Sequence, residues 1–260
     1  MAKLYAPTNS LERGLMFLEL IAQRPGGLMH AEIRRWFDVP TSTCSYILSR
    51  LEWHGYLKKN KSTGRYEVGL KLTALAYHIP QTTPFHPILQ TPMNELVEAT
   101  RLTAAVGVLR RGRVLLLENV DSPEPLRVNL TVGSEVPFDT CALGRVLIAW
   151  FPRRQLSALI EEYGLSKSAS RSPVTKSKLL QQLEVVRREG YAIHETTVGA
   201  RALAVPILDG QSRVCAALVA AGATALNVWK RFDSLVKRVN ATAETISELT
   251  RTVDWRQLYR

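Results

Sequence analysis

The sequence is poor in the residues that build disulfide frameworks and metal sites. It has three cysteines in 260 residues, Cys44, Cys141 and Cys215, and no Cys-x-x-Cys pair. Its five histidines are scattered, with no pair at positions i and i+4. This spacing excludes a disulfide framework and the common zinc sites, so we expect no metal and no cofactor.

Long apolar runs are also missing. The most apolar uncharged run, residues 214–229, includes Gly222 and Asn227 and is shorter than the ~20 residues that a membrane-spanning helix needs. Residues 1–9 lack the hydrophobic core of a signal peptide. These two absences predict a cytoplasmic protein without a membrane partner.

Positive charge, by contrast, is abundant. The net charge is +11 and the isoelectric point is near 9.8. Residues 1–80 hold 11 Lys and Arg against 6 Asp and Glu, and the much longer remainder holds 23 against 17. The excess of positive charge per residue is therefore higher in the N-terminal 80 residues. Such a field favours a polyanion, either nucleic acid or an anionic membrane surface, although many basic proteins bind neither.

Three helices are predicted in the first 54 residues. The first spans about 10–23, because Asn9 and Glu12 have the spacing of a capping box and apolar residues recur at helical spacing. A short helix over about 29–37 and a third over about 41–54 follow, and Gly55 ends the third at low conformational cost. The apolar stripe of the first helix is Leu11, Leu15, Leu18 and Ala22, and that of the third is Cys44, Ile47, Leu48 and Leu51.

After Gly55 the period changes from helical to alternating. Residues 56–59 and 65–68 are predicted strands, joined by the polar, basic loop 60–64. Helix, helix, turn, helix and basic hairpin is the order of a winged helix-turn-helix. We therefore predict a DNA-binding domain over residues 1–69. A linker helix (about 70–77) and a Pro/Thr-rich boundary occupy residues 70–83, and a second domain occupies residues 84–260.

The second domain is predicted to mix helices and strands. Length and composition, with 46% apolar and 22% charged residues, fit two soluble domains with full cores. Near-continuous apolar runs in the later strands predict burial on both faces of a sheet. The predicted helices are 87–100, 141–151, 153–163, 176–189 and 228–252, and the predicted strands are 103–109, 114–119, 127–130, 191–196, 202–208 and 214–220.

The outward face of the third helix is the predicted DNA-reading surface. In a helix-turn-helix this helix enters the major groove, so its exposed face must offer hydrogen-bonding groups. Hydroxyls near its N-terminus suit phosphates, and lysines of the hairpin would meet the backbone. The alternative to DNA binding is that residues 41–45 only cap the N-terminus of an ordinary surface helix. The predicted DNA-binding residues are Thr41, Ser42, Thr43, Ser45, Tyr46, Ser49, Arg50, Lys58, Lys59, Lys61 and Arg65.

The ordered motifs resemble those of the IclR family of transcriptional regulators over nearly the whole chain. The matching stretches are residues 10–15 (SLERGL), 40–43 (PTST), 51–56 (LEWHGY), 64–69 (GRYEVG), 141–149 (CALGRVLIA), 183–191 and 199–206. The resemblance implies an α+β protein with an N-terminal winged helix-turn-helix and a C-terminal GAF/PAS-like mixed α/β effector-binding domain. It also implies a homodimer or homotetramer that binds a near-palindromic operator in double-stranded DNA. A small-molecule effector would modulate this operator binding.

The chain departs from the family in its DNA-reading helix. The family often has a basic residue near position 41 and His-Arg near 45 and 46, where this chain has Thr41, Ser45 and Tyr46. Tyrosine cannot make the bidentate guanine contact that arginine makes. The operator sequence therefore does not carry over from the family.

The effector site is expected around the start of the helix over 141–151. Free amides of residues 141–144 would form an anion site, and apolar side chains would form the walls. An Ala-Leu-Gly start also suits tight helix–sheet packing. His194 could bind an anionic ligand when protonated, and it is explained at least as well as a solvated strand-end residue. Cys141, Val219 and Ala221 replace the family's usual hydroxyls, and His194 and Glu195 stand where acidic residues are typical. These replacements favour an apolar or aromatic carboxylic acid. The predicted effector-binding residues are Leu130, Val132, Cys141, Ala142, Leu143, Gly144, His194, Glu195, Ala202, Leu203, Ala204 and Val219.

Two other functions fit parts of the sequence. Cys141 at a helix N-terminus could be the nucleophile of a thiol-dependent enzyme or a redox sensor, with His194 as its base. A structural or partner-binding protein with a degenerate helix-turn-helix would fit the Tyr46 departure. We predict a regulator rather than an enzyme.

Overall fold

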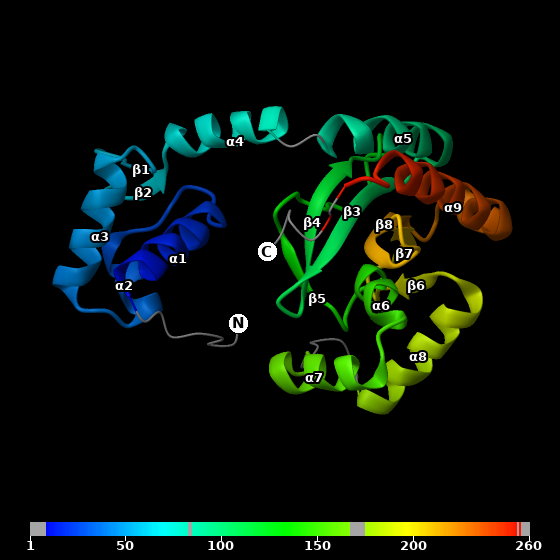
Figure 1. The fold of residues 1–260 in the computed structure, drawn as a ribbon. Coiled ribbons are helices and arrows are strands. Elements are labelled where there is room, and N and C mark those ends of the chain that lie inside the picture. The colour runs from blue at the N-terminus through cyan, green and yellow to red at the C-terminus, as the bar shows by residue number, and fades with distance from the viewer. Residues whose placement is uncertain (1–8, 83–84, 167–174, 254, 256–260) are drawn as a thin grey trace. The chain divides into compact units, whose positions relative to one another are not determined.

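A computed structural model describes residues 9–82, 85–166, 175–253 and 255. The chain divides into two compact units, Met1–Thr83 and Pro84–Arg260. We refer to the first as the head and to the second as the sensor domain (Figure 1).

The head contains three helices, a two-stranded hairpin and a fourth helix. The elements are α1 (Ser10–Ala22), α2 (His30–Phe37), α3 (Thr41–Trp53), β1 (Leu57–Lys59), β2 (Tyr66–Val68) and α4 (Leu70–Thr82). The side chain of Asn9 caps α1 by accepting a hydrogen bond from the Glu12 amide at 2.9 Å. Gly55 follows α3 with φ +77°, the left-handed conformation that ends a helix. The predicted order of helices and hairpin is confirmed.

The buried face of α1 is not the apolar stripe that predicted the helix. Leu11 and Leu15 are exposed, whereas Gly14, Phe17 and Ile21 are buried in the core of the head. That core packs α1 on α2 and α3, and Cys44, Ile47 and Leu48 are its contribution from α3. Sequence periodicity identified the helix correctly but selected the wrong side, because α1 carries apolar residues around most of its circumference.

Helix α4 is longer than predicted. It extends to Thr82, through part of the Pro/Thr-rich stretch that was expected to interrupt it near residue 79.

The sensor domain is a six-stranded antiparallel sheet between two layers of helices. Its strands are β3 (Thr103–Arg110), β4 (Arg113–Val120), β5 (Glu135–Pro137), β6 (Ala192–Glu195), β7 (Ala200–Leu208) and β8 (Val214–Ala223), in the order β5-β4-β3-β8-β7-β6. Its helices are α5 (Phe85–Thr100), α6 (Ala142–Ala149), α7 (Arg153–Tyr163), α8 (Lys176–Glu189), the short 3-10 helix η1 (Asn227–Arg231) and α9 (Phe232–Leu249).

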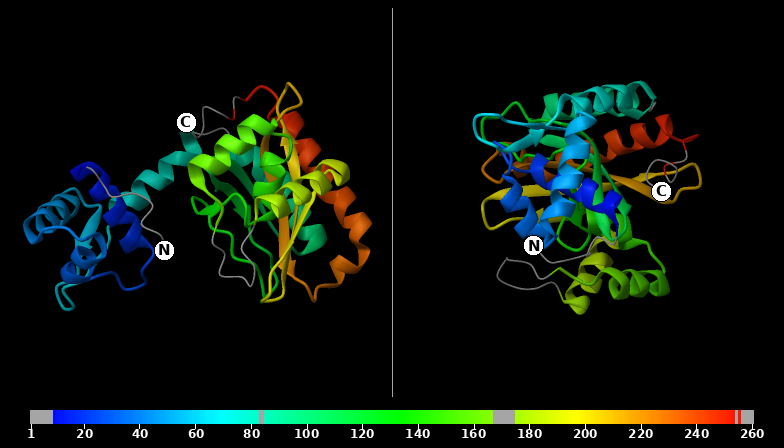
Figure 2. Two further views of the ribbon diagram at one scale, coloured as in Figure 1. Left: turned by 90° about the horizontal axis from the view of Figure 1, so that it is seen from below. Right: turned by 90° about the vertical axis from the view of Figure 1, so that its left-hand side faces the viewer.

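Each face of this sheet has its own hydrophobic core. One core joins α5 and α9 to alternate residues of β3, β7 and β8, such as Val106, Leu203 and Leu218. The other joins α6 and α8 to the intervening residues, such as Ala105 and Ala204. The right-hand view of Figure 2 shows the strands between these two helical layers. Burial on both faces explains why β8 is apolar almost throughout.

The strand predicted over residues 127–130 is wrong. These residues form no strand, and the edge strand is instead β5, which pairs with β4. Val128 and Leu130 are half-buried against the α6 core, so their alternating pattern reflects packing without backbone pairing. Pro123 and Pro125 precede them and lack the amide donors that a ladder needs.

Candidate functional site

Helix α3 presents a polar face to solvent. Of its predicted DNA-binding residues, Thr43 is half-buried and the others are exposed, with Tyr46 62% exposed. The opposite face is anchored in the core of the head, which fixes the orientation of the helix. The exposed members are Thr41, Ser42, Ser45, Tyr46, Ser49 and Arg50.

Side chains of α2 engage two of these hydroxyls. His30 Nε2 lies 2.9 Å from Ser45 Oγ, and Arg34 Nη1 donates to Thr41 Oγ1 at 3.4 Å. Ser49 Oγ donates to the Tyr46 carbonyl at 2.8 Å. Within the described part of the chain, Ser42, Tyr46 and Arg50 make no side-chain hydrogen bond. The sequence reasoning missed His30 and Arg34, although Arg34-Arg35 is a basic pair one turn before α3.

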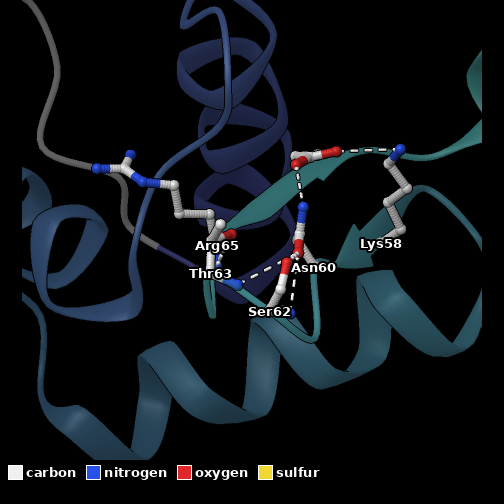
Figure 3. Close-up of polar contacts among 6 residues, drawn as sticks. Lys58, Asn60, Ser62, Thr63 and Arg65 are labelled. Atoms are coloured by element: carbon white, nitrogen blue, oxygen red, sulfur yellow. Dashed lines mark hydrogen bonds and ion pairs between the residues drawn. The ribbon is translucent and has the colours of Figure 1, made fainter.

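The hairpin β1–β2, which we call the wing (residues 57–68), is organised by Asn60 (Figure 3). Asn60 Oδ1 accepts from the amide and hydroxyl of Ser62 and from the Thr63 amide at 2.6–3.3 Å. Its Nδ2 donates to Glu67 Oε1 at 3.0 Å. These bonds close the loop, and Gly64 completes it at φ +70°.

The four cations of the wing are not equally available. Lys58 forms an ion pair with Glu67 at 3.0 Å across the hairpin, while Lys59 Nζ lies 5.4 Å from the centre of the Tyr66 ring. Lys61, at the tip, is exposed. Asn60 and Lys58 together lower the pKa of Glu67. Lys58, Lys59 and Lys61 remain on the surface of the wing.

Arg65 has a structural role instead. Its Nη1 donates to the Gly27 carbonyl at 2.7 Å and lies 3.3 Å from Glu32 Oε2. Glu32 also accepts from the Met29 amide at the start of α2. Arg65 therefore ties the wing to the first turn of α2, and its guanidinium is less available to a phosphate than the sequence suggested.

The sensor domain contains a cavity of about 220 Å³, which we call the sheet cavity. Its walls come from β4, β7, β8, the start of α6 and the segment 128–130. Aliphatic groups form most of the surface, and the polar groups come from the α6 start and from β6 and the turn after it. The lining residues are Val114, Leu116, Val128, Leu130, Val136, Thr140, Cys141, Ala142, Leu143, His194, Thr196, Ala200, Arg201, Ala202, Val219 and Ala221.

Seven of the twelve predicted effector-binding residues line the sheet cavity, and five do not. Val132 is 47% exposed, and Glu195 pairs with Arg201 at 3.5 Å. Leu203 is packed in the opposite core, as strand alternation requires, and Ala204 is buried in the α6 core without reaching the cavity. The fifth is Gly144. A Cβ there would lie 1.9 Å from the Phe138 carbonyl oxygen, so this glycine serves close packing.

The N-terminus of α6 is capped from within the protein. Cys141 Sγ accepts from the Gly144 amide at 3.3 Å and donates to the Pro137 carbonyl at 3.7 Å. Burial raises the pKa of the Cys141 thiol to about 11. A thiol that stays protonated at neutral pH is a poor nucleophile, which weakens the thiol-enzyme interpretation.

His194 is held by a buried arginine. Arg145, 9% exposed, donates from Nη1 to the Ile193 carbonyl at 2.9 Å, and its Nη2 lies 3.0 Å from His194 Nδ1. Because guanidinium nitrogens only donate, Nδ1 must accept, which places the imidazole proton on Nε2. Burial and the charge of Arg145 lower the pKa of His194. His194 therefore contributes a neutral N–H donor to the sheet cavity, and not the imidazolium that the sequence suggested.

Arg201 also lines the cavity, yet its guanidinium lies on the other side of the strand. It is 5.5 Å from the centre of the Trp229 ring and 5.9 Å from that of Phe232. Several other lining positions, including Thr140, Thr196 and Ala200, were missed, since turn and strand-end residues far apart in sequence give no periodic signal.

A helix with a polar exposed face next to a basic wing, joined in one chain to an α/β domain with an apolar cavity, defines a winged helix-turn-helix regulator. The sequence model of the IclR helix-turn-helix domain matches residues 10–61, and that of the bacterial transcriptional regulator IclR C-terminal domain matches residues 81–248. The chain belongs to the IclR family of bacterial transcriptional regulators. Membership in this family of regulators, rather than of enzymes, confirms the predicted function class.

Named relatives are regulators as well. The chain is 28% identical over 212 residues to the HTH-type transcriptional regulator XynR of Escherichia coli, covering 81% of this chain and 84% of the relative. It is 24% identical over 218 residues to the transcriptional repressor IclR of the same organism, covering 82% and 80%.

Solved structures share the fold. An IclR regulator from Alicyclobacillus acidocaldarius superposes with a TM-score of 0.79 at 23% identity, covering 93% of this chain and 98% of that one. An IclR homologue from Microbacterium hydrocarbonoxydans, complexed with 4-hydroxybenzoate, gives 0.77 at 21% identity, covering 94% and 100%. These matches confirm the predicted α+β fold. No helix among the described residues is long and apolar enough to cross a membrane.

Proposed function

We propose that this regulator binds operator DNA with the exposed face of α3 and the wing, and that a small, largely apolar carboxylic acid in the sheet cavity controls this binding. The observation that carries the proposal is the sheet cavity itself. It is lined mostly by aliphatic side chains with few polar groups, as in sites that orient a ligand through a small number of polar contacts.

The polar lining favours a hydrogen-bond acceptor on the ligand. His194 offers an N–H donor backed by the buried cation Arg145. The hydroxyls of Thr140 and Thr196 already donate to the Pro137 and Ala200 carbonyls. A carboxylate accepts a hydrogen bond from such a donor, and the Arg145 charge further favours an anion. A sugar would leave most of its hydroxyls unpaired against the aliphatic walls, which costs free energy.

The complexed relative supports an aromatic acid. Its structure holds 4-hydroxybenzoate, a flat ring with one carboxylate, in the same fold. For the present chain, Val219 and Ala221 make one wall of the sheet cavity apolar. We therefore place benzoate-like acids ahead of short hydroxy acids as effectors.

Isothermal titration calorimetry tests the ligand class. Titrations with benzoate and 4-hydroxybenzoate should give saturable binding, whereas benzyl alcohol and xylose should not. The substitution Ala202→Leu fills the sheet cavity and should abolish binding, while Val198→Leu, at an exposed loop position, should leave it unchanged. Binding of xylose, or unchanged binding by Ala202→Leu, would contradict the proposal.

DNA binding is proposed to use a homodimer or homotetramer on a near-palindromic operator in the cytoplasm. A two-fold protein reads two half-sites about one helical turn apart, and symmetry in the protein is mirrored in the DNA. Light scattering of the protein and footprinting on DNA flanking its own gene test both points. A monomer in solution with an asymmetric footprint would contradict them.

A further inference from the structure

A β-bulge in β4 turns one buried carboxyl away from the sheet cavity. In the pairing of β3 with β4, Val106 faces Glu118 and Gly107 faces Leu116, so Leu117 is the extra residue. Val114 and Leu116 line the sheet cavity. Without the bulge, Glu118 would follow them onto that face. With it, Glu118 lies opposite Val106, on the side of the sheet that α5 covers.

Glu118 is buried there and bonded to the first half of α5. Its side chain is 9% exposed. Oε2 accepts from His86 Nδ1 at 2.5 Å, and Oε1 accepts from Gln90 Nε2 at 2.9 Å. The Asn119 amide also donates to Oε1, at 3.1 Å. A buried carboxyl with three donors is costly to disturb, because each unpaired group would lose its solvation without compensation.

Pro92 separates this half of α5 from the rest of the helix. Proline has no amide hydrogen, so the Ile88 carbonyl lacks its helical donor. Leu89 before Pro92, and Met93, Leu96 and Val97 beyond it, are buried in the α5–α9 core. We call residues 85–91 the linker-proximal half of α5, because α4 ends at Thr82, only a few residues earlier in the chain. Among the described residues, its polar contacts with the sheet are those to Glu118 and one long hydrogen bond, 3.5 Å, from Gln90 Nε2 to the Asn119 carbonyl.

We propose that Glu118 is a positioning residue that ties the linker-proximal half of α5 to the strand lining the sheet cavity, so that occupancy of the cavity is passed to the linker helix. A ligand in the sheet cavity would contact the side chains of Val114 and Leu116. Glu118 on the same strand accepts hydrogen bonds from His86 and Gln90 of α5. The coupling rests on the proposed function of the sheet cavity, whereas the attachment itself does not.

Hydrogen exchange measured by mass spectrometry on the full-length protein tests the attachment. In Glu118→Ala, exchange over residues 85–91 should quicken by at least about tenfold, while residues 93–100 keep the exchange of the parent. Glu118→Gln retains an acceptor for Gln90 and the Asn119 amide, so it should restore most of the protection. Glu98→Ala, an exposed change on the same helix, is the matched control. A uniform rise along α5, or no rise, would overturn the proposal.

Two DNA-binding measurements test the coupling. Without any ligand, Glu118→Ala should change the affinity for DNA flanking its own gene at least threefold, while Glu98→Ala stays within twofold of the parent. With 4-hydroxybenzoate, Glu118→Ala should bind the acid as the parent does but lose most of the change in DNA affinity. Unchanged affinity, or a full response, would overturn the coupling. If the parent itself does not bind 4-hydroxybenzoate, the proposed ligand class is wrong. The DNA affinity measured without ligand then still decides whether Glu118 is a positioning residue.

Discussion

The head and the sensor domain hold their candidate functional residues in opposite settings. In the head, a single small core supports an exposed polar face on α3, so substitutions there reach solvent and leave packing intact. In the sensor domain, the residues that form the sheet cavity lie between buried strands and a buried helix, and many also belong to the α6 core. The head can therefore change its specificity by surface substitution, whereas the sensor domain must change ligand and packing together.

Two glycine substitutions should show this difference with the largest effect. Gly144 stands in the first turn of α6, where an added Cβ would lie 1.9 Å from the backbone oxygen of Phe138. Gly144→Ala should destabilise the sensor domain by about 3 kcal/mol, because neither backbone can yield easily. Gly14 stands inside α1, and its added Cβ would meet Ile47 at an ordinary 3.7 Å. Gly14→Ala should stabilise the head by about 0.5–1 kcal/mol, because alanine favours the helix.

Calorimetric unfolding of each variant checks the pair. A lowered transition for Gly144→Ala and a raised one for Gly14→Ala would support the contrast. Destabilisation of similar size at both positions would mean that the core of the head is as tightly packed as the start of α6.

The same contrast explains what the sequence could predict. In the head, Cys44, Ile47 and Leu48 identified the inward side of α3, and the exposed side followed from helical geometry. The elements of the sensor domain were also predicted well, since helices such as 153–163 and 176–189 are strongly periodic. The resemblance to a known family supplied the position of the cavity at the start of α6.

Other features depend on tertiary contacts that leave no local pattern. The bulge at Leu117 moves Glu118 to the opposite face of the sheet, and the sequence pattern of β4 does not predict this bulge. Arg65 resembled a surface cation until the fold placed the Gly27 carbonyl beside it. His194 looked ready to protonate, but Arg145, from a helix about fifty residues earlier, fixes it as a neutral donor. Leu203 was chosen with its strand although its side chain faces the other core.

Charge removal on the head should have the next largest effect. Arg50→Ala is expected to weaken binding to DNA flanking its own gene by about 1–3 kcal/mol, roughly five- to 150-fold, because Arg50 is exposed on α3 without an internal partner among the described residues. Lys58→Ala combined with Lys59→Ala should lower the salt slope of binding by roughly 0.9 for each phosphate that the wing no longer neutralises.

Electrophoretic mobility shift at several salt concentrations measures both changes. Lys178→Ala, which removes one charge from an exposed position on α8, is the control for net charge and should leave the affinity within about twofold. Arg50 and lysine variants that bind as tightly as the parent would show that another face of the head meets DNA.

The smallest expected effect concerns His194 and the pH dependence of the sensor domain. Burial and the charge of Arg145 lower the pKa of His194 below its ordinary value of 6.5. Above that value the side chain is neutral in both the folded and the unfolded chain, so it adds no pH dependence. As the pH falls below it, the unfolded chain takes up a proton at His194 that the folded chain does not, and stability falls until the pH reaches the lower folded pKa.

His194→Gln keeps a donor but cannot protonate. The melting temperature of the variant should therefore vary less than that of the parent between about pH 7 and pH 5, whereas His54→Gln, an exposed change in the head, should leave the transition of the sensor domain as it is in the parent. A parent sensor domain that gains stability on acidification relative to His194→Gln would mean that His194 gains a proton on folding and meets its ligand as a cation.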